Sequence, residues 1–293
     1  MRPFLSICIP TFNRAKYLGE CLGSFLSQIR PEVVDLLEIL VSDNASTDNT
    51  REYFSKFQYV TYSRNEKTIQ ADAHLDQVTR QAKGEWVWMF GDDDIALPGS
   101  LDTVLSMIEF ASPLCGFILL NKEVRNRDLS ITLLSNQNPC CPDIVFDSIK
   151  GLCSKFGFFT QTCFISTALF RRAPIMRVDP HPYLDIKMEF GHFGVWLEAF
   201  AHYRCRYLSD ILVCQRQGNN LERPYAAEWQ YISTEGICRV FEILVRKKLW
   251  TYFEAEGIRE QMIGSPPCRL IDLIPESYRA TFKAKLMEAG QGI

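Results

Sequence analysis

The first 120 residues alternate short apolar runs with segments in which apolar residues recur every three or four positions. The apolar runs predict buried strands at residues 4–9, 37–41, 59–62, 86–90 and 117–120. The periodic segments predict amphipathic helices at residues 15–28, 71–82 and 100–110, with a further helix starting near Ser46 or Thr47. Parallel strands need crossover connections of helix length, so this alternation predicts an α/β fold with a mostly parallel central sheet and helices on both faces.

The second half of the chain has a less regular pattern. It predicts strands at residues 162–165, 206–208 and 211–215, a helix at 195–202, and loops at 136–143 and 179–182. A long amphipathic segment, residues 229–253, predicts a helix that contains Arg246-Lys247-Lys248. We therefore expect one α/β domain over residues 1–222, in two halves that meet near residue 120, and a helical C-terminal extension over residues 223–293.

Composition narrows the class of protein. Lys and Arg number 32 against 35 Asp and Glu, a net charge of −3, so no nucleic-acid partner is expected. The eleven cysteines include no Cys-x-x-Cys pair, which favours a reducing compartment. The first apolar run is short for a signal peptide, and no window has the ~18 apolar residues of a membrane span. A cytoplasmic protein is expected.

Four polar segments begin where predicted strands end: residues 10–14, 42–46, 63–65 and 91–94. The carboxyl ends of parallel strands meet at one edge of a sheet, where ligands of open α/β folds bind. A single polar loop is explained by exposure to water, whereas four at one edge favour a binding site. Its candidate residues are Pro10, Thr11, Asn13, Arg14, Asp43, Asn44, Arg64, Asp92, Asp93 and Asp94.

Asp92, Asp93 and Asp94 form the most demanding of these segments. Adjacent carboxylates repel one another, and a bound cation lets all three stay ionised. Oxygen ligands of this kind suit Mg²⁺ or Mn²⁺ bound together with substrate phosphates. A solvated acidic turn is the alternative explanation.

Three common nucleotide and hydrolase motifs are missing. Neither Gly-x-Gly-x-x-Gly nor Gly-x-x-x-x-Gly-Lys-Ser/Thr follows the first strand, and no Gly-x-Ser-x-Gly occurs. Dehydrogenase, NTPase and serine hydrolase functions therefore lose their main support.

Three blocks in this order and spacing resemble the family 2 glycosyltransferases with a GT-A fold: residues 6–14 (SICIPTFNR), 38–48 (EILVSDNASTD) and 82–94 (AKGEWVWMFGDDD). The resemblance implies an inverting transferase that uses a nucleoside-diphosphate sugar and Mg²⁺ or Mn²⁺. It makes residues 1–120 the nucleotide-sugar half and residues 121–222 the acceptor half. The Gly-Asp-Asp-Asp form is similar to a subgroup that builds bacterial surface polysaccharides, including O-antigen abequosyltransferases.

The same resemblance implies roles for individual residues. Pro10, Thr11 and Asn13 would line the nucleotide pocket, and Asp43 would bind the base. The aspartates would hold the ribose and the metal–diphosphate. Many members read Asp-x-Asp-Asp at this point, and Gly91 stands here for the first aspartate. Which of Asp92, Asp93 and Asp94 binds the metal is left open.

An inverting transfer needs a base for the acceptor hydroxyl. Many members carry Glu-Asp shortly before Trp-Leu, and the comparable stretch here, residues 189–197 (EFGHFGVWL), puts His192 in place of the aspartate. Imidazole suits proton acceptance near neutrality. A partly buried structural histidine is the alternative for His192, and Asp185 and Glu189 are the alternative bases.

Residues 215–220 (QRQGNN) resemble the segment that often follows the last strand of this family's catalytic region. Arg216 in it would bind the diphosphate or the acceptor, or be a solvated loop residue. The acceptor would be a saccharide, free or lipid-linked. Arg246-Lys247-Lys248 would then contact the inner face of a membrane, or simply be a solvated helix end. Two other functions stay open: a non-catalytic sugar-nucleotide binder and a nucleotidyltransferase.

Overall fold

The structure, a computed structural model, describes residues 3–54, 57, 59–157, 162–187, 190–218, 226–251 and 254–255. Residue 53 and residues 226–235 are described by their backbone alone. The strands are β1 (Leu5–Thr11), β2 (Leu37–Asp43), β3 (Val60–Arg64), β4 (Trp86–Met89), β5 (Ile95–Ala96), β6 (Cys115–Arg125), β7 (Thr132–Leu134), β8 (Ile144–Phe146), β9 (Ala168–Arg171) and β10 (Arg204–Arg216). The helices are α1 (Ala15–Leu26), α2 (Thr50–Phe54), α3 (Ala71–Gln81), α4 (Ser100–Glu109), α5 (Ile149–Phe156), α6 (Arg172–Ile175), α7 (His181–Leu184), α8 (Gly191–Ala199) and α9 (Ala226–Arg246), with 3-10 turns η1 (Val34–Leu36) and η3 (Ile165–Thr167).

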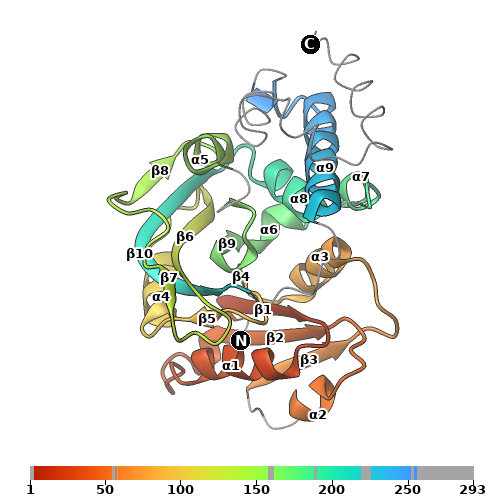
Figure 1. Ribbon diagram of the computed structural model, residues 1–293. Helices are drawn as coiled ribbons and strands as arrows, with labels where there is room; N and C mark the ends of the chain where they lie inside the picture. The colour runs from red at the N-terminus through yellow and green to blue at the C-terminus, as the bar shows by residue number, and fades with distance from the viewer. Residues whose placement is uncertain are drawn as a thin grey trace.

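The described strands form one sheet in the order β3-β2-β1-β4-β9-β6-β10-β5, with β7 on β6 and β8 on β10 (Figure 1). β3, β2, β1 and β4 are parallel neighbours. β9 is antiparallel to both β4 and β6, so β6 and its parallel partner β10 run in the direction of β4. All the long strands therefore share one direction, and their carboxyl ends meet at one edge.

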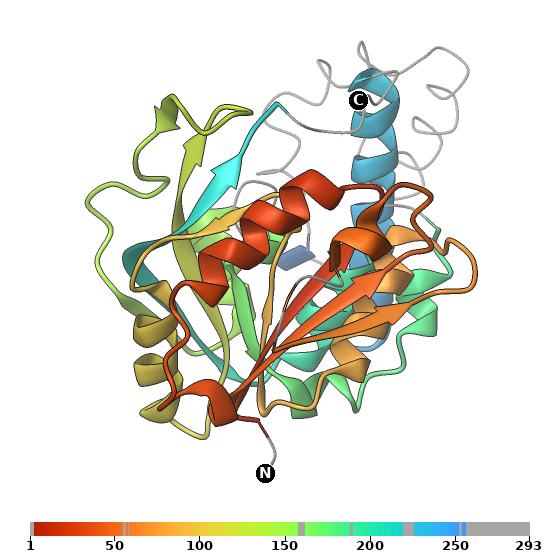
Figure 2. The same cartoon turned by 90° about the horizontal axis from the view of Figure 1, so that it is seen from below.

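Helices cover both faces of the sheet. Successive strand residues point to opposite sides, so a strand of apolar residues contributes to the core on each face. In β1, Ile7 and Ile9 pack with Leu18 and Phe25 of α1 in one core cluster that also includes α4. Cys8 belongs to the other cluster, with residues of α3, α5, α8 and α9. Figure 2 shows α1 and α9 on opposite sides of the sheet. The predicted α/β fold, with a mostly parallel sheet between two helical layers, is confirmed.

The helix after β2 begins later than the sequence predicts. α2 starts at Thr50, because the Asp48 carboxylate accepts the Thr50 N–H at 3.0 Å. Ser46 does not cap it; its hydroxyl accepts the Asn13 N–H at 2.8 Å. The predicted cap at Ser46 or Thr47 is therefore wrong, and Ser46 joins two loops at the carboxyl edge instead.

The predicted strand at residues 162–165 is also misplaced. Residues 165–167 form η3, and the strand β9 begins at Ala168. The turn is held because the Ser166 carbonyl accepts the Trp88 indole N–H at 2.9 Å. The loop predicted at residues 179–182 is partly wrong, because the short helix α7 already begins at His181, with Pro182 in its first turn.

α9 packs its apolar face on the domain, as the amphipathic pattern of residues 229–253 predicts, but it ends at Arg246. Ile237, Val240, Phe241 and Leu244 are buried in the cluster that contains α8. The expected boundary between residues 222 and 223 lies outside the described residues, so the two-part division stays a prediction. None of the described helices is long and apolar enough to cross a membrane.

Two glycines differ in the space around them and give a test of the packing. A Cβ at Gly84 would lie 2.6 Å from the Ser6 backbone nitrogen, so Gly84→Ala is expected to lower the free energy of unfolding by about 1–3 kcal/mol. At Gly23, on α1, an added Cβ would meet no atom within 4 Å. Gly23→Ala is the matched control, expected to raise that free energy by up to about 1 kcal/mol. Urea unfolding measures both, and equal effects would contradict this packing.

Candidate active site

Strand register places three predicted site residues side by side. Thr11 of β1 is paired with Asp43 of β2, and Asp43 with Arg64 of β3. Each is the last residue of its strand, so the loops that follow start from one line at the carboxyl edge. The sequence prediction that these loops meet is confirmed.

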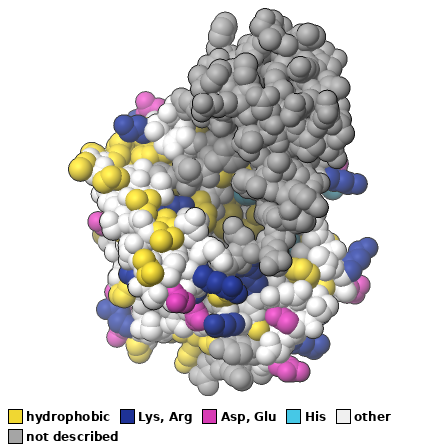
Figure 3. All heavy atoms as spheres, in the orientation of Figure 1, with side chains coloured by type: hydrophobic (Ala, Val, Ile, Leu, Met, Phe, Trp, Pro, Cys, Tyr) yellow, Lys and Arg dark blue, Asp and Glu magenta, His cyan; other side chains and the backbone are white. Residues whose placement is uncertain are grey.

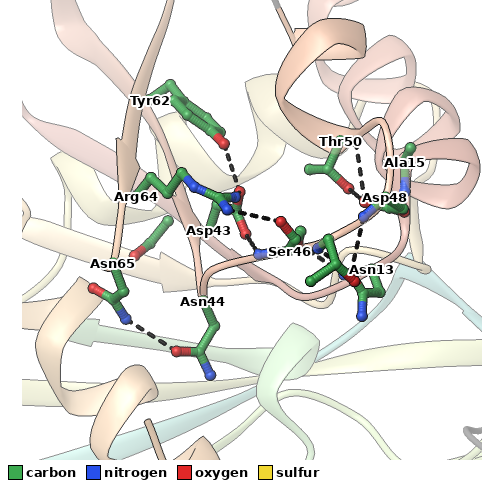
Figure 4. Close-up of polar contacts among 12 residues, drawn as sticks. Asn13, Ala15, Asp43, Asn44, Ser46, Asp48, Thr50, Tyr62, Arg64 and Asn65 are labelled. Carbon is green, nitrogen blue, oxygen red and sulfur yellow. Dashed lines mark hydrogen bonds and ion pairs between the residues drawn. The ribbon is translucent and has the colours of Figure 1, made fainter. Parts of the chain in front are cut away.

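Asp43 is fully buried and bonded on both carboxylate oxygens. Its Oδ1 accepts the Ser46 N–H at 2.8 Å, and its Oδ2 accepts the Tyr62 hydroxyl and the Arg64 guanidinium, each at 2.5 Å (Figure 4). Burial raises the pKa of Asp43, but the bonds from Ser46, Tyr62 and Arg64 outweigh burial and hold the pKa below its usual value. A stable negative charge therefore lies at the end of β2.

Asn13 joins the loops after β1 and β2. Its backbone is left-handed, with φ of 55°, a conformation that asparagine tolerates better than most residues. Its Oδ1 accepts the N–H groups of Thr47 at 2.7 Å and Asp48 at 3.3 Å. The Asn13 side chain is thus used in shaping the wall of the site.

Asn44 has the same kind of role on the other side of Asp43. Its amide group donates to the Ile69 carbonyl at 2.8 Å and accepts the Ile69 N–H at 2.9 Å. Its oxygen also accepts the Asn65 amide at 3.0 Å (Figure 4). Asn44 therefore fixes the segment that leads from β3 to α3.

The aspartates after β4 point to different partners. Asp92 accepts the Thr11 hydroxyl at 2.7 Å and the Phe12 backbone N–H. Asp93, partly exposed, pairs with the Arg14 guanidinium at 2.5 Å. Thr11 and Arg14 thus connect the loop after β1 to the aspartate turn.

Asp94 lies deepest and connects the turn to the second half of the sheet. Its Oδ2 accepts the Ser166 hydroxyl at 2.5 Å, and its Oδ1 accepts the Arg216 N–H at 3.0 Å. The Ser166 oxygen in turn accepts the Gly91 N–H at 2.8 Å. Burial raises the pKa of Asp94, and the positive charge of Lys122, buried on β6, offsets part of that rise. Sequence reasoning missed Ser166 and Lys122, since neither belongs to a motif.

Gly91 lies within this turn, where the family pattern has an aspartate. A Cβ at this position would lie 3.1 Å from the Asp94 Oδ2, 3.2 Å from the Asp93 Oδ1 and 3.2 Å from the Ser166 hydroxyl. A side chain at this position would therefore require these three oxygens to shift by a few tenths of an ångström.

The aspartate turn is chemically suited to a divalent cation. Burial, and then the charge of Asp93, raises the pKa of Asp92 and of Asp94 to about 7. Carboxylate oxygens are the ligands that Mg²⁺ and Mn²⁺ prefer, so the donors fit. Among the described residues, however, no three His, Cys, Asp or Glu side chains are grouped to hold a metal ion. Substrate phosphates would have to complete such a site.

Arg216 is almost fully buried and bonded to protein groups. Its Nε donates to the Asp93 carbonyl at 2.8 Å, one terminal nitrogen donates to the Arg127 carbonyl at 2.7 Å, and the other pairs with Glu20. A solvated loop arginine does not fit this burial. The guanidinium instead ties α1 and the end of β6 to the aspartate turn, and contact with the diphosphate or the acceptor stays a prediction.

A cavity of about 940 Å³ opens beside Arg216, between α1 and the turn from β6 to β7. Tyr17, Arg127 and Gln217 contribute to its lining. Arg216, which lines the cavity, also donates to the Asp93 carbonyl of the aspartate turn. Hydrophobic side chains gather on the face over β7 and β8, as Figure 3 shows.

His192 lies in the first turn of α8 and is buried. Its Nδ1 is 2.6 Å from the Oδ1 of Asp72, a residue of α3 that sequence reasoning missed. Of the alternative bases, Asp185 is exposed after α7, and Glu189 lies outside the described residues.

The basic end of α9 has acidic neighbours. Lys247 pairs with Glu198 at 2.6 Å, and Arg246 lies 3.7 Å from Glu242. Contact of Arg246-Lys247-Lys248 with a membrane stays a prediction.

Sequence comparison agrees with this arrangement of loops. Residues 6–171 match glycosyl transferase family 2, and the chain belongs to this family.

Among curated proteins, the chain is 38% identical over 103 residues to abequosyltransferase RfbV of Salmonella typhimurium, covering 33% of this chain and 30% of that protein. It is 32% identical over 127 residues to a Campylobacter jejuni protein, GalNAc(5)-diNAcBac-PP-undecaprenol beta-1,3-glucosyltransferase, covering 41% of this chain and 40% of that protein. The matches thus span less than half of either relative.

Solved structures of low sequence identity share the fold. Mannosyltransferase PcManGT of Pyrobaculum calidifontis, in complex with GDP-Man and Mn²⁺, has a TM-score of 0.60 at 19% identity, over 100% of this chain and 77% of that one. Staphylococcus aureus TarS with UDP-GlcNAc has a TM-score of 0.59 at 16% identity, over 98% of this chain and 89% of that one. The GT-A fold implied by the sequence is confirmed.

The raised pKa values of Asp92 and Asp94 predict a pH dependence of stability without metal. Between pH about 4 and about 7 the folded protein keeps protons that the unfolded chain releases, so rising pH lowers the free energy of unfolding. The double variant Asp92→Asn/Asp94→Asn lacks this loss. In EDTA, the Tm of the unmodified protein is expected to fall relative to the variant as pH rises through this window. Parallel Tm curves would contradict the raised values.

Proposed function

We propose that this protein is an inverting, metal-dependent glycosyltransferase that moves a sugar from a nucleoside-diphosphate sugar to a saccharide acceptor, free or lipid-linked, in surface polysaccharide or O-antigen synthesis. The observation that carries the proposal is the juxtaposition at one sheet edge of the Asp43 site with the turn of Asp92, Asp93 and Asp94.

The Asp43 side of the edge would bind the nucleoside. Arg64 is held by Asp43 and by the Ser46 carbonyl at 2.8 Å, while 31% of its side chain remains exposed. A planar guanidinium fixed at a rim can stack on a nucleobase. Pro10, Thr11 and Asn13 would form the opposite wall, with Asn44 holding the neighbouring segment.

The aspartate side would bind the ribose and the diphosphate. Asp92, Asp93 and Asp94 would hold Mg²⁺ or Mn²⁺, and the assignment within the three stays open. When bound, such a cation neutralises charge that develops on a departing nucleoside diphosphate. Arg14 pairs with Asp93 and would remain as a nearby positive charge.

The transfer itself needs an attacking hydroxyl and a base. The acceptor oxygen forms a bond to the anomeric carbon while the bond from that carbon to the phosphate oxygen breaks, and the nucleoside diphosphate leaves. His192 would take the hydroxyl proton. Attack from the side opposite the leaving group inverts the anomeric configuration, which NMR of the product tests directly.

The choice of acceptor rests on the relatives. The Campylobacter jejuni relative is named for an acceptor linked to undecaprenol, and RfbV for abequosyl transfer. A lipid-linked acceptor would bring this protein to a membrane surface, where Arg246-Lys247-Lys248 would be the contact. Binding to anionic liposomes at low salt tests that contact.

Asp94→Ala is expected to abolish metal-dependent transfer and leave the fold intact, because it removes a carboxylate from the proposed cation site. Asp102→Ala is the matched control; Asp102 is exposed on α4 and pairs with Arg30 at 2.6 Å. The assay is release of nucleoside diphosphate from a panel of nucleotide sugars with Mn²⁺. Near-normal turnover of Asp94→Ala would overturn the metal site. Release of pyrophosphate from nucleoside triphosphates would indicate a nucleotidyltransferase instead. The absence of product with every donor would indicate a non-catalytic binder.

His192→Ala is expected to lower kcat by about 10²-fold or more if His192 is the base. His202→Ala is the control, since His202 is exposed after α8. Unchanged turnover of His192→Ala would move the role to Asp185 or Glu189.

A further inference from the structure

Asp72 and His192 form a hydrogen-bonded pair between the first turns of two helices. Asp72 Oδ1 lies 2.6 Å from His192 Nδ1, and Asp72 Oδ2 accepts the Gly191 N–H at 2.9 Å. Both side chains are buried, with 4% and 7% of the two residues exposed. The partners come from α3 and α8, so the contact is built by the fold rather than by a local motif.

The pairing decides which ring nitrogen of His192 carries a proton. An ionised carboxylate only accepts hydrogen bonds, so Nδ1 must be the donor to Asp72. In the neutral ring the lone pair is then on Nε2. Within the described part of the chain, Nε2 is buried and has no hydrogen-bond partner. Such an atom is costly to bury, and a hydroxyl group of a bound substrate would satisfy it.

The backbone just before His192 has a strained conformation that brings the Gly191 N–H to the Asp72 carboxylate. Phe190 is left-handed, with φ of 77°, which is costly for an aromatic residue. At Gly191 a Cβ would lie 2.8 Å from the Tyr183 carbonyl and 3.3 Å from Asp72 Oδ2. The strained turn and the glycine together let the N–H of residue 191 reach the carboxylate.

We propose that Asp72 is the positioning residue of the transfer reaction: it holds His192 in the tautomer whose Nε2 accepts the proton of the acceptor hydroxyl. This inference rests on the proposed function. In the step, the O–H bond of the acceptor breaks as its oxygen bonds to the anomeric carbon. The proton goes to Nε2, and the bonding pair of the donor leaves with the nucleoside diphosphate.

Asp72→Asn is the informative substitution, because it keeps size and removes charge. Oδ2 faces two donors, the Gly191 N–H and the Gln70 amide at 3.5 Å. The amide oxygen of the variant therefore settles on that side, and its NH₂ faces Nδ1. Nδ1 becomes the acceptor and the proton moves to Nε2, which then has no lone pair for the hydroxyl proton.

The kinetic test measures nucleoside diphosphate release with the donor that the unmodified protein uses. Asp72→Asn is expected to lower kcat by about 10²-fold at unchanged donor KM. Combined with His192→Ala, it is expected to cost nothing further, since both changes remove one function. Asp76→Asn is the control, and its kcat is expected to be unchanged. Asp76 is buried one turn further along α3 and pairs with Arg80. Additive losses, or a full kcat in Asp72→Asn, would overturn the proposal.

A spectroscopic test reads the tautomer directly and does not depend on turnover. The chain has four histidines, so ¹⁵N-histidine NMR can assign His192 by comparison with His192→Gln. The Nδ1–H tautomer is expected in the unmodified protein and the Nε2–H tautomer in Asp72→Asn. An Nε2–H tautomer in the unmodified protein would overturn the proposal. If the unmodified protein transfers no sugar from any donor, the proposed function itself fails; if it does and only the Asp72 results disagree, the positioning role alone fails.

Discussion

The buried carboxylate of Asp94 is the contact on which the site depends. It accepts hydrogen bonds from Ser166, next to β9, and from the backbone of Arg216, at the end of β10. The turn after β4 is thereby attached to both later parts of the sheet. Its position therefore depends on chain segments far away in sequence, and the Asp94 contacts add to the pairing of β4 with β9 and to the bond from Arg216 to the Asp93 carbonyl.

Burial acts against the ionised form of the carboxylates at this edge of the sheet, and their surroundings compensate for it to different degrees. Asp43 stays ionised because three donors surround it, whereas Asp92 and Asp94 have pKa values near neutrality. The two ends of the edge thus have different electrostatic characters: Arg64 compensates the charge of Asp43, whereas Asp92 and Asp94 take up protons near neutrality. In the proposed function, a nucleotide bound with its metal would favour the ionised form of Asp92 and Asp94 and leave the contacts of Asp43 unchanged.

Local patterns in the sequence predicted strands β1 to β4, β6 and β10, both helical layers and the loops at the carboxyl edge, because long buried strands and amphipathic helices leave a periodic signal. The short strands β5, β7 and β8 were not predicted. These patterns failed where a residue far away in the sequence determines the local structure. η3 replaces a predicted strand because Ser166 contacts Trp88 and the aspartate turn. The contact of Asp72 with His192 spans 120 residues and leaves no periodic signal. The burial of Arg216 likewise depends on Glu20 and Arg127, which no motif connects to it.

The glycine at position 91 couples that position to residue 166. Oxygens of Asp93, Asp94 and Ser166 would lie 3.1–3.2 Å from a Cβ at position 91, so any larger residue there requires these side chains to shift by a few tenths of an ångström. One of them, the Ser166 hydroxyl, both accepts the Gly91 N–H and donates to Asp94. A side chain at position 91 would therefore disturb the hydrogen bonds that hold the deepest carboxylate of the turn.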